Sequence, residues 1–112
     1  MPYSKRMVTL VESPLFTKQV HDYLTDDEYR AFQLFLAANL DVGAVVRGSG
    51  GVCKVRWNRR GTGKSGGVRV LYFVRTEAGE IWLLVIYAKS AIDSIPGHIL
   101  KALKEEMEHA TR

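Results

Sequence analysis

Hydrophobic positions in the first third of the chain recur at helical spacing. Ser13 followed by a proline is typical of a helix start and predicts a short helix over residues 15–23. The sequence TDDE at residues 25–28 has the form of a capping box, which predicts a second helix to about residue 38. The apolar face of this helix is interpreted as core packing and consists of Tyr29, Phe32, Phe35 and Leu36.

Four further segments have the pattern of strands. MVTLVES at residues 7–13 predicts a short strand. VCKVRWN at residues 52–58 alternates between a basic side, which includes Asn58, and an apolar side. VRVLYFV at residues 68–74 predicts a strand that is buried on both sides except at Arg69, and IWLLVIYAK at residues 81–89 predicts a strand that is apolar on both sides until Tyr87 and Lys89.

The chain closes with a predicted helix. Asp93 or Ser94 would cap it, and Pro96 would lie in its first turn. Apolar residues then recur every four positions, and this stripe consists of Ile95, Ile99, Leu103 and Met107.

The predicted order of elements is βααβββα in a single domain over residues 1–112. Consecutive strands joined by short loops run antiparallel, because parallel neighbours need a long crossover connection. We therefore expect an α+β fold with a small antiparallel sheet, mixed at the N-terminal strand, and with helices packed on one face.

The chain of 112 residues has a formal net charge of +4, but its charges are unevenly placed. The segment from Arg47 to Arg75 holds eight of the sixteen cations and none of the twelve acids. Such a concentration indicates a polyanion site, with nucleic acid the leading candidate, because ordinary surfaces mix both signs. The alternative is a solvated basic surface without a ligand. The eight cations are Arg47, Lys54, Arg56, Arg59, Arg60, Lys64, Arg69 and Arg75.

The stretch RRGTGKSGGVRV at residues 59–70 imitates a nucleotide-binding motif. It contains G-x-G-x-x-G and the last part of a Walker A sequence. Both motifs cradle phosphate only where the glycine loop leads into a helix, whereas a strand is predicted to follow here. The stretch is therefore interpreted as a cationic hairpin loop, which would bring Arg59, Arg60 and Lys64 to a polynucleotide backbone. Arg47 is assigned to the same RNA- or ribosome-binding set.

No metal or cofactor site is visible in the sequence. The three histidines are scattered and Cys53 stands alone, so neither a metal cluster nor an internal disulfide is expected. A single cysteine and the lack of a long apolar run predict a cytoplasmic protein without a membrane span.

The basic segment could support metal-free cleavage of RNA. The 2′-hydroxyl of RNA is a built-in nucleophile, so an enzyme needs to align it, move protons and stabilise a dianionic phosphorane. A lysine crowded by other cations loses its proton more easily and can act as a base, which makes Lys54, beside Arg56 and near Arg69, a candidate. Tyr87 and Lys89 are candidates for an acid or a phosphate ligand. The alternatives are that the cations only bind phosphate and that Tyr87 is a packed aromatic; the residues alone favour binding over cleavage.

Three blocks in this order, GSGGVCKVRW, RGTGKSGGVRVLYF and LLVIYAKS, resemble the RelE/HigB-type toxins of bacterial type II toxin–antitoxin pairs. The resemblance is closest to the HigB-like branch and covers nearly the whole chain. It implies an mRNA interferase, a ribosome-dependent endoribonuclease that cleaves A-site codons by 2′-hydroxyl attack and inhibits translation. It also implies two partners, the ribosome with its messenger RNA and a cognate antitoxin with a helix-turn-helix DNA-binding domain.

The resemblance also assigns residues. The basic catalytic positions match Lys54, Arg56 and Arg69, and Lys89 matches the lysine that ends the fourth strand. Two positions depart from RelE: Ser90 replaces an arginine, and SAIDSIPGH at residues 90–98 has no tyrosine near the start of the final helix. Proton transfer would then depend more on Lys54 or Tyr87.

The sequence is also consistent with two other functions. Relatives of the ParE type share the fold and poison DNA gyrase, although a basic strand and loop favour RNA as the target. A non-catalytic nucleic-acid-binding module is consistent with the absent tyrosine.

Overall fold

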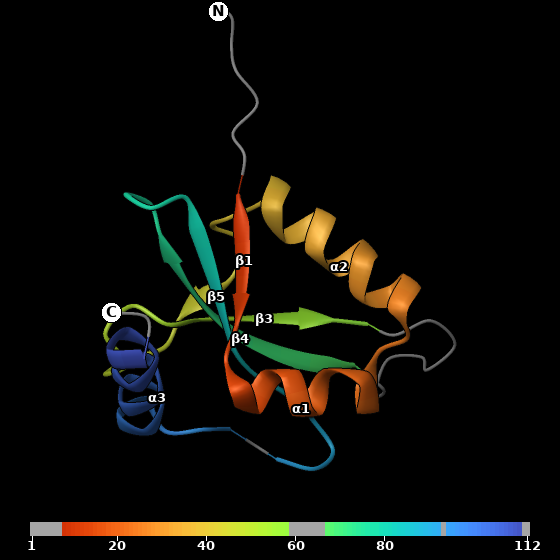
Figure 1. The fold of residues 1–112 in the computed structure, drawn as a ribbon. Coiled ribbons are helices and arrows are strands. Elements are labelled where there is room, and N and C mark those ends of the chain that lie inside the picture. The colour runs from red at the N-terminus through yellow and green to blue at the C-terminus, as the bar shows by residue number, and fades with distance from the viewer. Residues whose placement is uncertain (1–7, 59–66, 93, 111–112) are drawn as a thin grey trace, which may run out of the picture.

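The structure, a computed structural model, describes residues 8–58, 67–92 and 94–110 of the chain. It has three helices and one mixed sheet, so the predicted α+β class is confirmed (Figure 1). The elements in chain order are β1 (Thr9–Glu12), α1 (Pro14–Tyr23), α2 (Asp26–Ala38), β2 (Ala44–Val45), β3 (Cys53–Trp57), β4 (Val68–Arg75), β5 (Glu80–Ala88) and α3 (Gly97–Ala110).

The sheet has five strands in the order β1-β5-β4-β3-β2. β1 runs parallel to β5, and the other neighbours are antiparallel, which confirms the expected sheet with mixed pairing at the N-terminal strand. β2 was not predicted. It contains only two residues, which is too short for an alternating pattern to be recognised.

The first two helices begin as the sequence predicted. The Ser13 hydroxyl accepts a hydrogen bond from the amide of Phe16, and a proline occupies the first turn of α1. At α2, the Thr25 hydroxyl accepts from the amide of Glu28, and the Glu28 carboxylate accepts from the amide of Thr25. The capping box is therefore formed in full.

Helices cover both faces of the sheet. α1 and α2 pack on one face against a cluster that includes Val55, Val70 and Ile86. α3 packs on the other face, where its cluster includes Leu71 and Val85. The prediction that the helices pack on one face is right for α1 and α2 and wrong for α3. β4 and β5 are apolar on both sides, so each side must be covered from water.

The pairing of β4 with β5 contains a β-bulge. Leu71 pairs with Val85 and Tyr72 pairs with Leu83, so Leu84 has no partner on β4. Leu84 and Val85 consequently both join the cluster beneath α3. A bulge changes the direction of the side chains on either side of it. The bulge at Leu84 therefore determines which side chains at the end of β5 lie on the α3 face of the sheet.

α3 differs from its predicted form in two details. It begins at Gly97, after Pro96, whose carbonyl accepts from the amide of Ile99 at 3.1 Å; Ser94 is exposed before the helix, and Asp93 lies outside the described residues. The predicted every-fourth stripe is also wrong at Ile99, which is 42% exposed. A helix turns in 3.6 residues, so a strict four-residue repeat drifts off the buried face. The side chains that pack on the sheet are Leu100, Leu103 and Met107.

The turn between β2 and β3 supports the start of α3. The buried Ser49 hydroxyl donates to the carbonyl of Val46 at 2.6 Å and accepts from the amide of Val52 at 2.9 Å. A Cβ at Gly97 would lie 2.0 Å from the carbonyl oxygen of Arg47, so only glycine lets α3 begin against this turn. The glycines of the turn with positive φ are Gly48, Gly50 and Gly51.

Candidate functional site

The pairing of β3, β4 and β5 aligns their residues in three rows on the α3 face of the sheet. Register partners on neighbouring strands point to the same side, and so do residues two positions apart along a strand. The amide of Lys89 donates to the carbonyl of Gly67 at 3.5 Å, which continues the ladder beyond the end of β5. The inner row, beneath α3, is Lys54, Leu71 and Val85; the arginine row is Arg56, Arg69 and Tyr87; the outer row is Asn58, Gly67 and Lys89.

The arginine row places two like charges directly opposite each other. Such partners have Cβ atoms about 5 Å apart, and like charges in this position are destabilising. Arg56 is exposed and Arg69 is half-buried, and neither forms an ion pair with a carboxylate in the part of the chain that the structure describes. An anion held between the two guanidinium groups would relieve the repulsion, so the row is suited to a phosphate.

Lys54 and Lys89 lie on opposite sides of the arginine row. Lys54 belongs to the inner row on β3, and Lys89 belongs to the outer row at the end of β5. Arg69, on the strand between them, completes a diagonal across three neighbouring strands. Rows are separated by roughly 7 Å, the length of two residues along a strand. A group bound at Arg69 therefore has a lysine on each side.

Tyr87 is in the arginine row but not at the surface. Its side chain is 2% exposed and belongs to the hydrophobic cluster under α3. This burial supports the interpretation of Tyr87 as a packed aromatic that lies beside Arg69. The sequence could not show it, because it depends on where α3 crosses the sheet.

Of the other cations of the basic segment, the structure describes Arg47 and Arg75. Arg47 lies on the exposed turn before β3, next to the start of α3. Arg75 lies at the far end of β4, where its guanidinium carbon is 4.7 Å from the centroid of the Trp82 ring. The residues of the glycine-rich loop, Arg59, Arg60 and Lys64, lie outside the described residues.

The described residues offer no metal-binding cluster of three or more histidine, cysteine or acidic side chains. Burial raises the pKa of the Cys53 thiol, which disfavours the reactive thiolate. Within residues 8–58, 67–92 and 94–110, no helix has the length and apolar character needed to cross a membrane.

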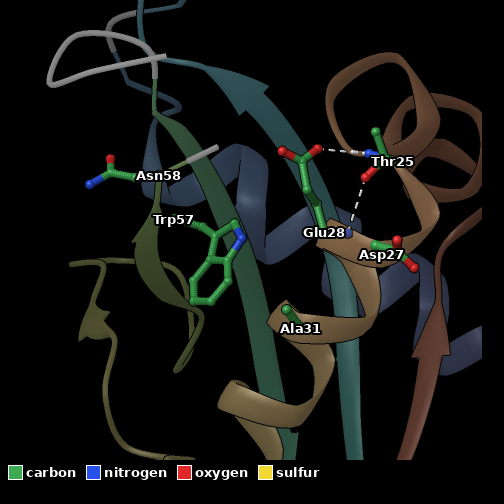
Figure 2. A pocket seen from close by; sticks show the side chains of 6 residues that line it. All are labelled: Thr25, Asp27, Glu28, Ala31, Trp57 and Asn58. Carbon is green, nitrogen blue, oxygen red and sulfur yellow. Dashed lines mark hydrogen bonds between the residues drawn. The ribbon is translucent and has the colours of Figure 1, made fainter. Parts of the chain in front are cut away.

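A cavity of about 560 Å³ lies at the N-terminal end of α2, where it meets the end of β3 (Figure 2). Figure 2 shows the Trp57 ring facing α2, with the Glu28 carboxylate held in the capping box. Trp57 packs with Phe32 and Phe35 on the side of the sheet that α1 and α2 cover. With Asp27 also in its lining, this cavity is acidic and does not match a polyanion.

Two residues of the outer row were not assigned to the site from the sequence. Asn58 follows Lys54 and Arg56 in the same alternation, which was the available signal. Gly67 was interpreted as part of a loop, although it precedes Arg69 by two positions and therefore faces the same side. Its location between Asn58 and Lys89 depends on the strand register, which the sequence pattern does not specify.

The fold is that of the RelE-like toxins, as the sequence resemblance predicted. The chain is similar to the E. coli toxin RelE, in a structure of the free state of a mutant with two arginines replaced by alanine. The TM-score is 0.57 at 17% sequence identity, and the match covers 88% of this chain and 96% of the RelE chain. No protein-family model matches the chain.

Proposed function

We propose that this protein is the toxin of a toxin–antitoxin pair and an endoribonuclease that cleaves messenger RNA at A-site codons on the ribosome. The RelE-like fold and the charge of the α3 face support this function. The observation that carries the proposal is the diagonal of Lys54, Arg69 and Lys89, because it has a phosphate ligand in the middle and a proton carrier on each side.

Arg56 and Arg69 hold the scissile phosphate in this proposal. Both guanidinium groups donate hydrogen bonds to phosphate oxygens, and their positive charge stabilises the dianionic phosphorane as it forms. Their register pairing places the two arginines opposite each other on neighbouring strands before RNA arrives. Tyr87 packs beside Arg69 on the next strand and supports its position.

Lys54 and Lys89 move the protons. The 2′-oxygen attacks phosphorus while Lys54 accepts the hydroxyl proton; the bond from phosphorus to the 5′-oxygen breaks while the Lys89 ammonium gives that oxygen a proton. The products are a 2′,3′-cyclic phosphate and a 5′-hydroxyl end. In-line displacement puts the attacking and leaving oxygens on opposite sides of phosphorus, which matches lysines on opposite sides of the arginine row.

The proposal implies the same partners as the sequence resemblance. The ribosome and its messenger RNA supply the substrate in the cytoplasm, and the cations assigned from the sequence, Arg47, Arg59, Arg60 and Lys64, contact the RNA or ribosomal backbone. A cognate antitoxin with a helix-turn-helix domain would neutralise the toxin. A small neighbouring gene that encodes such a protein would support this pairing.

The site assignment predicts which cations matter. Lys54→Ala and Arg69→Ala should each slow cleavage of messenger RNA in a translating extract by about 100-fold or more, the usual cost of removing a general base or a transition-state donor. Arg75→Ala is the matched control, because it removes a cation of the same segment that lies over Trp82, away from the rows. It should cleave at the wild-type rate, and all three variants should unfold at similar temperatures.

The same extract separates the competing functions. Cleavage unchanged by both substitutions would refute the site assignment. Intact messenger RNA with accumulated gyrase–DNA cleavage complexes would establish a ParE-like poison instead. Salt-dependent RNA binding without any product would establish a non-catalytic binding module.

A further inference from the structure

Position 67 has no side chain on the cationic face because a side chain there would not fit. Its φ is not positive, so its backbone conformation does not require glycine. A Cβ at this position would lie 2.7 Å from Oδ1 of Asn58 and 3.6 Å from Cγ of Arg56. The first distance is too short for any real Cβ contact, so the Asn58 side chain lies in the space that a side chain at position 67 would occupy.

Asn58 is placed next to the proposed phosphate ligands. It is exposed, it lies one row beyond Arg56 on the same side of the sheet, and its carboxamide forms no hydrogen bond within the described residues. Asn58 also lines the edge of the acidic cavity at the start of α2. In Figure 2 this carboxamide extends away from Trp57 and from α2. The amide thus carries donor and acceptor atoms that have no partner among the described residues.

The chemistry of the amide indicates which part of RNA it suits. A phosphate offers only acceptors and is better matched by the neighbouring arginines. A carboxamide both donates and accepts, which matches a base edge or a ribose 2′-hydroxyl.

We propose that Asn58 binds the nucleoside next to the scissile phosphate and that Gly67 is a positioning residue, which gives the Asn58 amide its place. The proposal rests on the ribonuclease function proposed above and deepens it, because it identifies a subsite that reads a nucleoside rather than a phosphate. Asn58 would then influence which codons are cleaved, whereas Arg56 and Arg69 would act on all codons alike.

A double-mutant cycle tests the subsite. Asn58→Ala, Gly67→Ala and the double variant are compared with the wild type in a translating extract, and cleavage is mapped codon by codon. Each single variant should slow cleavage by roughly threefold to tenfold, the worth of one neutral hydrogen bond, and the double variant should be no slower than either. Thr76→Ala, an exposed polar residue in the turn before β5, is the control and should cleave like the wild type.

The outcomes are distinct. Relative rates that change between codons identify a base edge as the contact, and a uniform loss identifies the ribose hydroxyl. Additive losses in the double variant would overturn the proposal, and so would an active Asn58→Ala variant, whether or not Gly67→Ala is impaired. If the wild-type protein itself yields no cleavage, the ribonuclease function fails. The affinity for RNA then tests the subsite separately: an Asn58→Ala variant with unchanged RNA affinity would show that the subsite is wrong as well.

Discussion

At the scale of single residues, Tyr72 links two parts of the chain that are far apart in sequence. Its ring is fully buried in β4. Its hydroxyl accepts from the amide of Gly43 at 2.9 Å and donates to the carbonyl of Leu40 at 3.1 Å. Both partners belong to the connection between α2 and β2, so one hydroxyl fixes this connection against the sheet.

Tyr72→Phe should therefore lower the free energy of unfolding by about 1 kcal/mol, because it leaves a partly buried amide and a partly buried carbonyl without their partner. Tyr23→Phe is the control, since the Tyr23 hydroxyl has no hydrogen bond within the described residues. Urea unfolding measures both. Equal stability of the two variants would show that the Tyr72 hydroxyl contributes nothing.

At the scale of elements, the two helix starts are built differently. The Ser13 hydroxyl caps α1 and also donates to the carbonyl of Leu84 in β5 at 2.7 Å, and the residue is buried. The Thr25 hydroxyl caps α2 at an exposed site. Ser13 therefore joins a helix to the sheet, whereas Thr25 acts within its own helix.

Replacing each cap with alanine should reveal this difference. Thr25→Ala should cost about 1 kcal/mol, the ordinary cost of losing a cap. Ser13→Ala should cost roughly twice as much, because the carbonyl of Leu84 loses a buried partner as well. Chemical unfolding of both variants provides the comparison. A larger loss for Thr25→Ala would contradict the role of Ser13 in joining α1 to β5.

The elements also show how far the sequence could predict the structure. Alternation along β3 placed Lys54 and Arg56 on one side correctly, because one face of that strand is apolar. Alternation identifies no single core face along β5, because this strand is apolar on both sides and contains the bulge at Leu84. Nothing local in the sequence marks that bulge, so the choice between an exposed and a packed Tyr87 stayed open until the structure showed its burial.

The register between strands was a second limit. The sequence predicted that Arg56 and Arg69 lie on adjacent strands, but a long glycine-rich loop does not fix which residues stand opposite each other. The rows, and with them the places of Asn58 and Gly67, follow only from the observed pairing. The roles of all these residues in cleavage remain predictions.

At the scale of the whole molecule, the burial of three ionisable side chains makes the stability of the fold depend on pH in the alkaline range. Burial raises the pKa of Tyr29, and its hydrogen bond to Glu12 raises it further. Burial likewise raises the pKa of the Tyr72 hydroxyl and of the Cys53 thiol. As pH rises past the ordinary values of these groups, about 9 to 10, the unfolded chain releases protons that the folded chain retains. The stability they contribute is complete at lower pH and decreases as pH rises.

The free energy of unfolding should thus be nearly constant between about pH 7 and 9 and decrease above about pH 10. Tyr29→Phe cannot ionise at this position, so its stability should decrease less steeply with pH. Tyr23→Phe should keep the wild-type slope. Urea unfolding at a series of pH values, with a reductant present for Cys53, gives all three slopes. A Tyr29→Phe slope equal to that of the wild type would refute the contribution of Tyr29.

The parallel pairing of β1 with β5 determines the order in which a newly made chain can fold. The carbonyl of Leu84 in β5 is the partner of Ser13, which lies 71 positions earlier. At 5–20 residues per second, β1 waits roughly 4 to 14 seconds during synthesis before its partner strand exists. Lys54 and Arg69 are made before β5 is complete, but Lys89 follows that strand. The proposed catalytic diagonal therefore forms late in synthesis, and a nascent chain passes through an interval in which this diagonal is incomplete.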